Sequence, residues 1–139
     1  MRTSFVIDAS VIISWRDPRP QESYGQNILT LMNRESAIVP VICCMEVNNV
    51  LRQFEKRGLI TRETTLETIE LISGLPISVD EAPVNFRMPR VEALARRYDL
   101  TIYDACYLEL AARLALPLAT MDSKLIAALK NAGLALKTA

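Results

Sequence analysis

The sequence predicts an α/β domain in which a parallel sheet of about five strands is flanked by helices on both faces. Short apolar runs rich in β-branched residues alternate with longer segments of helical periodicity, which is typical of this architecture. The chain has 139 residues, of which 50% are hydrophobic. One domain over residues 1–139 can therefore bury a substantial core, and no repeat or linker divides it.

The N-terminal segment predicts a strand, a short helix and a loop. Residues 5–8, FVID, form the expected first strand. Ser10 can cap a short helix that runs to Trp15. The segment RDPRP is expected to be a loop, because two prolines interrupt it. A helix follows at about residues 21–34, where apolar side chains recur on one face.

The next segment predicts a second strand and two helices. The strand is AIVP, residues 37–40, and its proline suits the first turn of a helix. That helix is expected to run to Arg57 and to end at Gly58, because glycine readily ends helices. Thr61 can cap the following helix, which Gly74 ends.

The C-terminal half continues the alternation, beginning with a third strand in PISVD. A parallel sheet needs such crossover helices between its strands. The remaining expected elements, in chain order, are a connection at 81–88, a helix at 89–98, a helix opened by Thr101, a strand at 116–122, a helix that Gly133 ends, and a short fifth strand at 134–137.

Charge is balanced over the chain, with 16 basic and 16 acidic residues. No global field draws the protein to nucleic acid or to an anionic membrane, so any such binding must come from a local patch. No segment approaches the roughly 20 consecutive apolar residues that span a bilayer, and the N-terminus lacks a secretory signal pattern. We therefore expect a cytoplasmic protein that does not act at a membrane.

The chain contains no histidine. This absence excludes Ser-His-Asp and Cys-His catalysis, histidine-based ribonuclease chemistry and histidine-ligated zinc. The cysteines, Cys43, Cys44 and Cys106, lack metal-motif spacing and are interpreted as small buried hydrophobes. Any chemistry must use carboxylates, hydroxyls, Lys or Arg.

Two acids each follow an expected strand. Asp8 closes the first strand and Asp122 closes the fourth, in LATMD. In open parallel sheets ligands bind beyond the carboxyl ends of the strands, so both acids are expected at the ligand-binding edge. Each could instead begin a turn or a helix, as Asp often does.

A third acid lies inside the helix expected at residues 40–57. Its apolar face is expected to run through Met45 and Phe54. Because helical neighbours are three and four residues apart, Glu46 and Asn49 fall on that face and are expected to point inward. A buried salt bridge, or a place at the edge of the apolar stripe, is the structural alternative.

The fourth acid, Asp104, follows Thr101 by three residues, which has the form of a capping box. Capping alone could explain Asp104. However, the segment TIYDACYLELA is largely apolar, and a helix N-terminus also stabilises a carboxylate that binds a ligand. Asp104 could therefore cap and ligate at once. Asp99, in RRYDL, could be a fifth acid near the site, but it is interpreted as a surface residue at a helix end.

Four inward-tending carboxylates without matching buried cations would repel one another. A divalent metal would offset this repulsion, and oxygen-only ligands suit Mg²⁺ or Mn²⁺. One or two such ions can activate a water and polarise a phosphodiester. The residues therefore predict a metal site for hydrolysis. Its expected ligands are Asp8, Glu46, Asp104 and Asp122.

Several segments together resemble the PIN-domain ribonucleases, and among them the VapC-like toxins of toxin–antitoxin systems. The segments are VIDAS, PVICCMEVNNVLR, LTIYDACYLELAARLALPLATMDSKL and KNAGLAL, and they span nearly the whole chain. Matched motif by motif, the acidic site of the family falls on the same four acids. The resemblance implies that two hydroxyls near the metal are those of Ser10 and Thr120.

The resemblance also implies a function, that of an endoribonuclease toxin that hydrolyses RNA with a metal-activated water. Mg²⁺ or Mn²⁺ would be the cofactor, and the chain would form a homodimer inhibited by a cognate antitoxin. Apolar positions that could receive an antitoxin helix are Leu51, Phe54, Leu59 and Ile60, although burial in the core is the alternative for most of them. Cations that could draw RNA to the acids are Arg16, Arg87, Arg90 and Lys124.

Two other functions are compatible with part of the pattern. An aspartyl-phosphate phosphohydrolase also has an acid after its first strand, but it needs a second acid two residues later, where this chain has Ser10. A non-catalytic PIN-like module, used for binding or regulation, would keep the fold without turnover. The four intact acids favour the nuclease.

Overall fold

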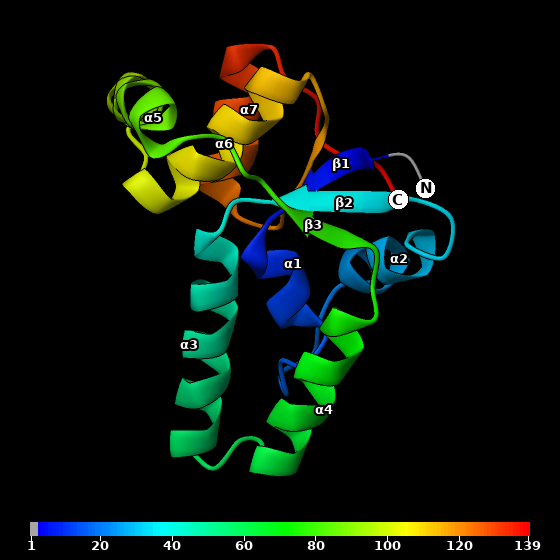
Figure 1. The fold of residues 1–139 in the computed structure, drawn as a ribbon. Helices are drawn as coiled ribbons and strands as arrows, with labels where there is room; N and C mark the ends of the chain where they lie inside the picture. The colour runs from blue at the N-terminus through cyan, green and yellow to red at the C-terminus, as the bar shows by residue number, and fades with distance from the viewer. Residues whose placement is uncertain (1–2) are drawn as a thin grey trace.

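The computed structural model describes residues 3–139 and shows a parallel sheet between helical layers (Figure 1). The strands are β1 (Thr3–Ile7), β2 (Ser36–Val39), β3 (Ile77–Val79) and β4 (Leu118–Ala119). They pair in the order β3-β2-β1-β4, all parallel. The helices are α1 (Ala9–Ser14), α2 (Tyr24–Leu31), α3 (Ile42–Lys56), α4 (Arg62–Ser73), α5 (Val84–Tyr98), α6 (Ile102–Leu114) and α7 (Ser123–Ala132). The predicted α/β class with helices on both faces is confirmed.

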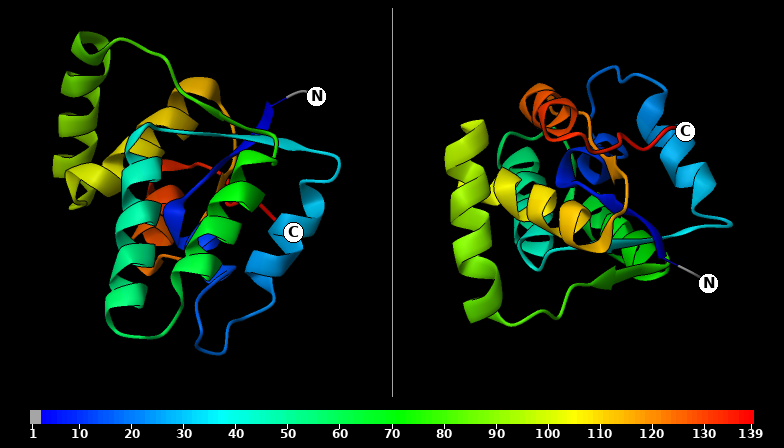
Figure 2. Two further views of the ribbon diagram at one scale, coloured as in Figure 1. Left: turned by 60° about the horizontal axis from the view of Figure 1, so that its bottom comes forward. Right: turned by 90° about the horizontal axis from the view of Figure 1, so that it is seen from above.

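The two helical layers differ in how they cover the sheet. Helices α1, α3 and α4 lie on one side, where α3 and α4 form a hairpin that extends away from the strands (Figure 1). Helices α5, α6 and α7 lie on the other side, with α6 against the sheet and α5 outermost (Figure 2). The carboxyl ends of β1, β2 and β4 lead directly into α1, α3 and α7, so the starts of these helices gather at one sheet edge.

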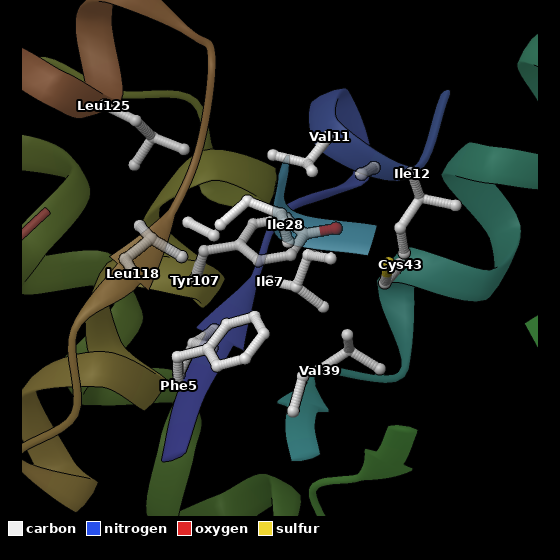
Figure 3. Packing of buried hydrophobic residues seen from close by; sticks show 14 of the residues in the cluster. Phe5, Ile7, Val11, Ile12, Ile28, Val39, Cys43, Tyr107, Leu118 and Leu125 are labelled. Carbon is white, nitrogen blue, oxygen red and sulfur yellow. The ribbon is translucent and has the colours of Figure 1, made fainter. Parts of the chain in front are cut away.

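The core is centred on β1, whose Phe5, Val6 and Ile7 are fully buried. Figure 3 shows Tyr107 and Leu118 packing around this strand. Burying a large apolar side chain contributes about 1.5–3 kcal/mol, so this cluster is a main source of stability. Helix α6 is buried on several sides because it lies between the sheet, α5 and α7, which explains why its sequence is apolar nearly all round.

The expected fifth strand is reduced to one bridge, between Leu118 and Leu136. Leu118 N donates to Ala135 O at 3.0 Å, and Lys137 N donates to Leu118 O at 2.9 Å. Because β4 itself has only two residues, it offers few backbone groups for a longer pairing. The four described strands therefore make up a sheet slightly smaller than predicted.

Helix α5 begins at Val84, five residues before the predicted start, and includes Pro89. A proline inside a helix removes the hydrogen bond to the carbonyl four residues earlier, here that of Asn85. Asn85 is exposed, so water can satisfy this carbonyl. The connection predicted at 81–88 is accordingly shorter than expected.

The buried face of α3 also differs from the prediction. Met45 is 56% exposed and Asn49 is exposed, whereas Cys43, Val47 and Leu51 are buried. The apolar stripe is rotated by about one residue, which turns a helix by roughly 100°. Apolar residues occur on more than one side of α3, so the periodicity of its sequence does not by itself identify the buried face.

Within residues 3–139, no helix combines the length and the apolar character needed to cross a bilayer.

Candidate functional site

Asp8 lies directly after β1, at the carboxyl edge of the sheet, and its residue is only 4% exposed. It occupies the N-cap position of α1, but its side chain makes no capping hydrogen bond. Its backbone N–H continues the sheet by donating to Ala119 O of β4 at 2.9 Å. The capping alternative therefore does not explain this carboxylate.

Two hydroxyls hold the Asp8 side chain. Ser10 Oγ donates to Asp8 Oδ2 at 2.8 Å, and Thr120 Oγ1 donates to the same oxygen at 2.7 Å. Ser10 Oγ also accepts from Met121 N at 3.0 Å. The sequence predicts that Ser10 caps α1, but its hydroxyl instead links Asp8 to Met121 in the segment after β4.

Burial is the main reason why the pKa of Asp8 is raised from 3.8 to about 6. The Thr120 and Ser10 hydroxyls oppose this rise in pKa, while the charges of Glu46 and Asp104 add to it. None of these groups is a cation. Asp8 is thus a buried carboxylate whose charge is compensated only by hydroxyl donors among the described residues that act on it.

Asp122 follows β4 and caps α7, because its Oδ2 accepts from Leu125 N at 2.9 Å. Asp122 N donates to Thr120 Oγ1 at 3.1 Å, so the hydroxyl that holds Asp8 also contacts this turn. Asp122 therefore caps α7, as the structural alternative predicted, and it also lies beside another predicted acid, Asp104.

Asp104 lies in the first turn of α6, where its N–H donates to Thr101 Oγ1 at 3.1 Å. The predicted cap at Thr101 is confirmed. Burial and the charge of Asp122 raise the pKa of Asp104, whereas the Thr101 side chain and Lys124 lower it. Thr101 is therefore the residue that caps α6, and the half-buried Asp104 carboxylate interacts electrostatically with Asp122.

Glu46 is half-buried on the second turn of α3, and its Oε1 accepts a hydrogen bond from Tyr107 Oη at 2.6 Å. Burial raises the pKa of Glu46, the Tyr107 hydrogen bond lowers it, and the charge of Asp104 raises it further. Glu46 makes no salt bridge within the described chain. The predicted inward tendency of Glu46 is therefore supported, although that of Asn49 is not.

Electrostatic interactions connect all four predicted acids. Asp8 interacts with Glu46 and Asp104, and Asp104 also interacts with Glu46 and Asp122. Their donor set consists only of oxygen, which suits a hard divalent cation. As the side chains stand, no three acidic or cysteine side chains among residues 3–139 are close enough together to hold a metal ion. A shared ion would therefore require side-chain rotation or bridging waters.

The predicted cations have different surroundings. Arg16 Nε donates to Thr68 Oγ1 at 2.9 Å, which ties the end of α1 to α4, so this side chain has a structural use. Arg90 stacks over the Phe86 ring at 4.4 Å. Arg87 lies beside the Cys106 thiol, and its buried Nε has no hydrogen-bond partner among residues 3–139. Lys124 interacts with Asp104 and is the candidate cation beside the acids.

Sequence reasoning overlooked Tyr107. A tyrosine three residues after Asp104 lies on the same side of the helix and carries a polar group into an apolar segment. Asp99 has the expected position, exposed at the end of α5, with a left-handed backbone of φ 52°.

The fold and these residues define a class of protein, an α/β domain that presents acids at the carboxyl edge of a parallel sheet. The chain belongs to the PIN domain family, whose model matches residues 5–130. PIN domains are generally nucleases. No protein with a curated description matches the sequence at a significant level.

Solved structures show the same fold. PAE2754 from Pyrobaculum aerophilum is 21% identical, with a TM-score of 0.72 over 92% of this chain and 87% of that one. A toxin–antitoxin complex from Klebsiella pneumoniae contains a chain that is 19% identical, with a TM-score of 0.61 over 89% and 91%. FitAcB from Neisseria gonorrhoeae matches at 18% identity, with a TM-score of 0.57 over 96% of both chains.

Proposed function

We propose that this chain is a Mg²⁺- or Mn²⁺-dependent endoribonuclease and the toxin of a VapBC-type toxin–antitoxin pair. The observation that carries the proposal is the state of Asp8, a buried carboxylate at the sheet edge that is surrounded by hydroxyls and further acids. Family membership supports a nuclease, and the Klebsiella pneumoniae structure supports an association with an antitoxin.

Each site residue has a role in this reaction. Asp8, Asp104 and Asp122 would hold the ion, and Glu46 would either ligate it or orient the attacking water. Ser10 and Thr120 keep the Asp8 carboxylate in one orientation through their hydrogen bonds. When bound, the ion would supply a nucleophilic water at neutral pH and charge stabilisation at the phosphate.

RNA is the proposed substrate, and its phosphates must approach a cluster of negative charges. Lys124 is exposed on the first turn of α7, beside Asp104, where it can contact a phosphate. The formal net charge of the chain is zero, so this local cation matters more than any global attraction. Arg16 is not proposed as an RNA contact, because it already binds Thr68.

An antitoxin partner would need an apolar surface. Of the four candidate positions, Leu51 and Phe54 are buried in the core, as the alternative predicted, and cannot contribute. Leu59 is exposed and Ile60 is half-buried. A groove of about 270 Å³ lies between α3, α4 and the edge strand β3 instead. Its apolar lining includes Val47, Ile69, Ile72 and Val79. This groove is the proposed docking place for the antitoxin.

The proposed homodimer would use another apolar surface. A groove of about 410 Å³ lies between the starts of α3, α5 and α6. Val41, Val84, Met88 and Ile102 line it and are each at least 46% exposed. A second copy would remove this apolar area from water.

We expect the protein to act in the cytoplasm.

A cleavage assay on a mixed, structured RNA tests the proposed function. The chain should cleave with Mg²⁺ or Mn²⁺ and stop on chelation, Asp8→Asn should be inactive, and Asp99→Asn should remain active. Asp99 is a suitable control because it is exposed and asparagine also adopts its left-handed backbone. Cleavage that survives chelation or Asp8→Asn would exclude this mechanism. RNA or metal binding without cleavage would favour the non-catalytic module.

A further inference from the structure

Tyr107 is a fully buried tyrosine whose hydroxyl contacts an acid of the site. It lies on α6, one turn after Asp104, and its exposed fraction is 0%. Its Oη donates to Glu46 Oε1 at 2.6 Å, although the two residues are 61 positions apart. Figure 3 shows the ring crossing the core, with the oxygen directed toward the side where Cys43 lies.

The surroundings of this hydroxyl determine what it can do. Burial raises the pKa of Tyr107 far above its usual range, so the group remains a hydrogen-bond donor. Burial also raises the pKa of the neighbouring Cys43 thiol to about 12. The thiol is therefore protonated at neutral pH, and the single proton of the phenol is directed to the Glu46 carboxylate.

We propose that Tyr107 is a positioning residue, which holds one oxygen of Glu46 so that the other stays available to the metal and its water. This inference rests on the proposed function, because it assigns a task to the support of the acid site.

The physical basis is the freedom of the Glu46 side chain. A glutamate on the second turn of a helix has several rotamers, and the charges of Asp8 and Asp104 would repel its carboxylate toward solvent. A short hydrogen bond from a rigid, buried ring restricts these rotamers before any ion arrives. Because α6 carries both Asp104 and Tyr107, one helix fixes two of the four acids relative to each other.

Packing alone does not explain the hydroxyl. Phenylalanine would fill nearly the same volume, and the tyrosine oxygen needs a partner once it is buried. Glu46 is half-buried and could be solvated without that partner. Glu46 therefore does not need this hydrogen bond for its solvation. The main effect of the bond is to restrict the orientation of the Glu46 side chain.

The test is Mn²⁺ binding to the purified chain without RNA, measured by titration calorimetry for wild type and Tyr107→Phe. We expect Tyr107→Phe to weaken Mn²⁺ affinity by about tenfold, the lower end for loss of a group that orients a ligand. Tyr98→Phe is the matched control, because Tyr98 lies on α5 outside the acid site. Its affinity should stay within about twofold of wild type, the change expected for a distant site.

A double-mutant cycle separates positioning from general damage. In a Glu46→Ala background, Tyr107→Phe should change Mn²⁺ affinity little, because its target is absent. An unchanged affinity of Tyr107→Phe, or an equal loss in both backgrounds, overturns the positioning role. If wild type binds no Mn²⁺, the proposed function is wrong, and the positioning role, which depends on it, is wrong as well. If wild type binds and Tyr107→Phe binds equally well, only the positioning role fails.

A second measurement needs no folded Tyr107 variant. The chain has four tyrosines, so fluorotyrosine labelling gives four ¹⁹F signals, which Phe variants of Tyr24, Tyr98 and Tyr103 assign. Mg²⁺ should shift the Tyr107 signal in wild type and not in Glu46→Ala. A Tyr107 signal that does not respond when Mg²⁺ binds also overturns the proposal.

Discussion

Changing Asp8 to Asn should stabilise the metal-free protein at neutral pH. The carboxylate is buried, and the described groups that act on it include two hydroxyls and two acids but no cation. Asparagine keeps the shape of the side chain, and its carbonyl can accept the hydrogen bonds that Ser10 and Thr120 donate. A loss of capping is not expected, because Asp8 makes no side-chain cap bond.

The magnitude follows from the pKa of Asp8. A rise from 3.8 to about 6 means that ionising this group costs the folded state about 3 kcal/mol relative to the unfolded chain. That value is an upper limit for the gain, because the asparagine N–H₂ must find acceptors in a buried place. We therefore expect Asp8→Asn to raise the free energy of unfolding by about 1–2 kcal/mol in chelator at pH 8.

The pH dependence has a definite sign. Because the folded protein binds this proton more tightly than the unfolded chain, the contribution of Asp8 to stability is fully present below about pH 4 and is lost as pH rises to about 6. The loss is complete about one pH unit above the folded pKa. The advantage of Asp8→Asn should therefore be largest at pH 8 and fall by about half at pH 5.

Urea unfolding at pH 5 and pH 8, in chelator and with Mg²⁺, measures these quantities. Mg²⁺ at 100 times its dissociation constant should stabilise wild type by about 2.7 kcal/mol and Asp8→Asn much less. Asp99→Asn, the same substitution at an exposed helix end, should change stability by less than about 0.5 kcal/mol. If Asp8→Asn is less stable than wild type in chelator at pH 8, and Mg²⁺ shifts neither protein, Asp8 is a structural residue.

Three further changes probe the surroundings of Asp8 and the cations. Thr120→Val removes a hydroxyl that lowers the pKa of Asp8, so the pKa of Asp8 should rise in this variant. The midpoint of Mg²⁺ binding against pH should then move to higher pH, and an unchanged midpoint would contradict this expectation. Lys124→Ala should weaken RNA binding and reduce the salt slope of affinity by about one, with unchanged stability. Arg16→Ala should lower the free energy of unfolding by about 1–2 kcal/mol through its lost bond to Thr68, while RNA affinity at fixed salt stays the same.

The features predicted correctly from sequence depend on local interactions. Thr61 and Thr101 each accept a hydrogen bond from the backbone three residues later, so their caps are visible in the local sequence. Gly58 and Gly133 end helices with φ of 71° and 69°, where residues with a Cβ are disfavoured. These signals reproduced most element boundaries to within a few residues.

The errors arose where tertiary contacts outweigh local preference. Serine is common at helix N-caps, but the Ser10 hydroxyl bonds to Asp8 and to the segment after β4. The buried face of α3 depends on which neighbours arrive from α1 and the sheet, so Met45 and Asn49 were placed inward incorrectly. The sequence predicts a helix start at Pro89, but Pro89 lies more than one turn inside α5, at an exposed position.

Asp8 and Asp122 show most clearly what a local pattern cannot separate. Each follows a strand and precedes a helix, so the sequence assigns them the same two alternatives. In the structure Asp122 caps its helix, whereas Asp8 turns to a hydroxyl on Thr120, 112 residues away. That contact exists because β1 and β4 are adjacent parallel strands whose ends meet. Asp8 makes no cap bond to α1 and has only hydroxyl donors as partners among the described groups that act on it, so keeping its carboxylate charged lowers the stability of the folded protein unless a cation is present. A bound metal ion should therefore stabilise the folded protein through Asp8, whereas a carboxylate that only caps a helix would give no such effect.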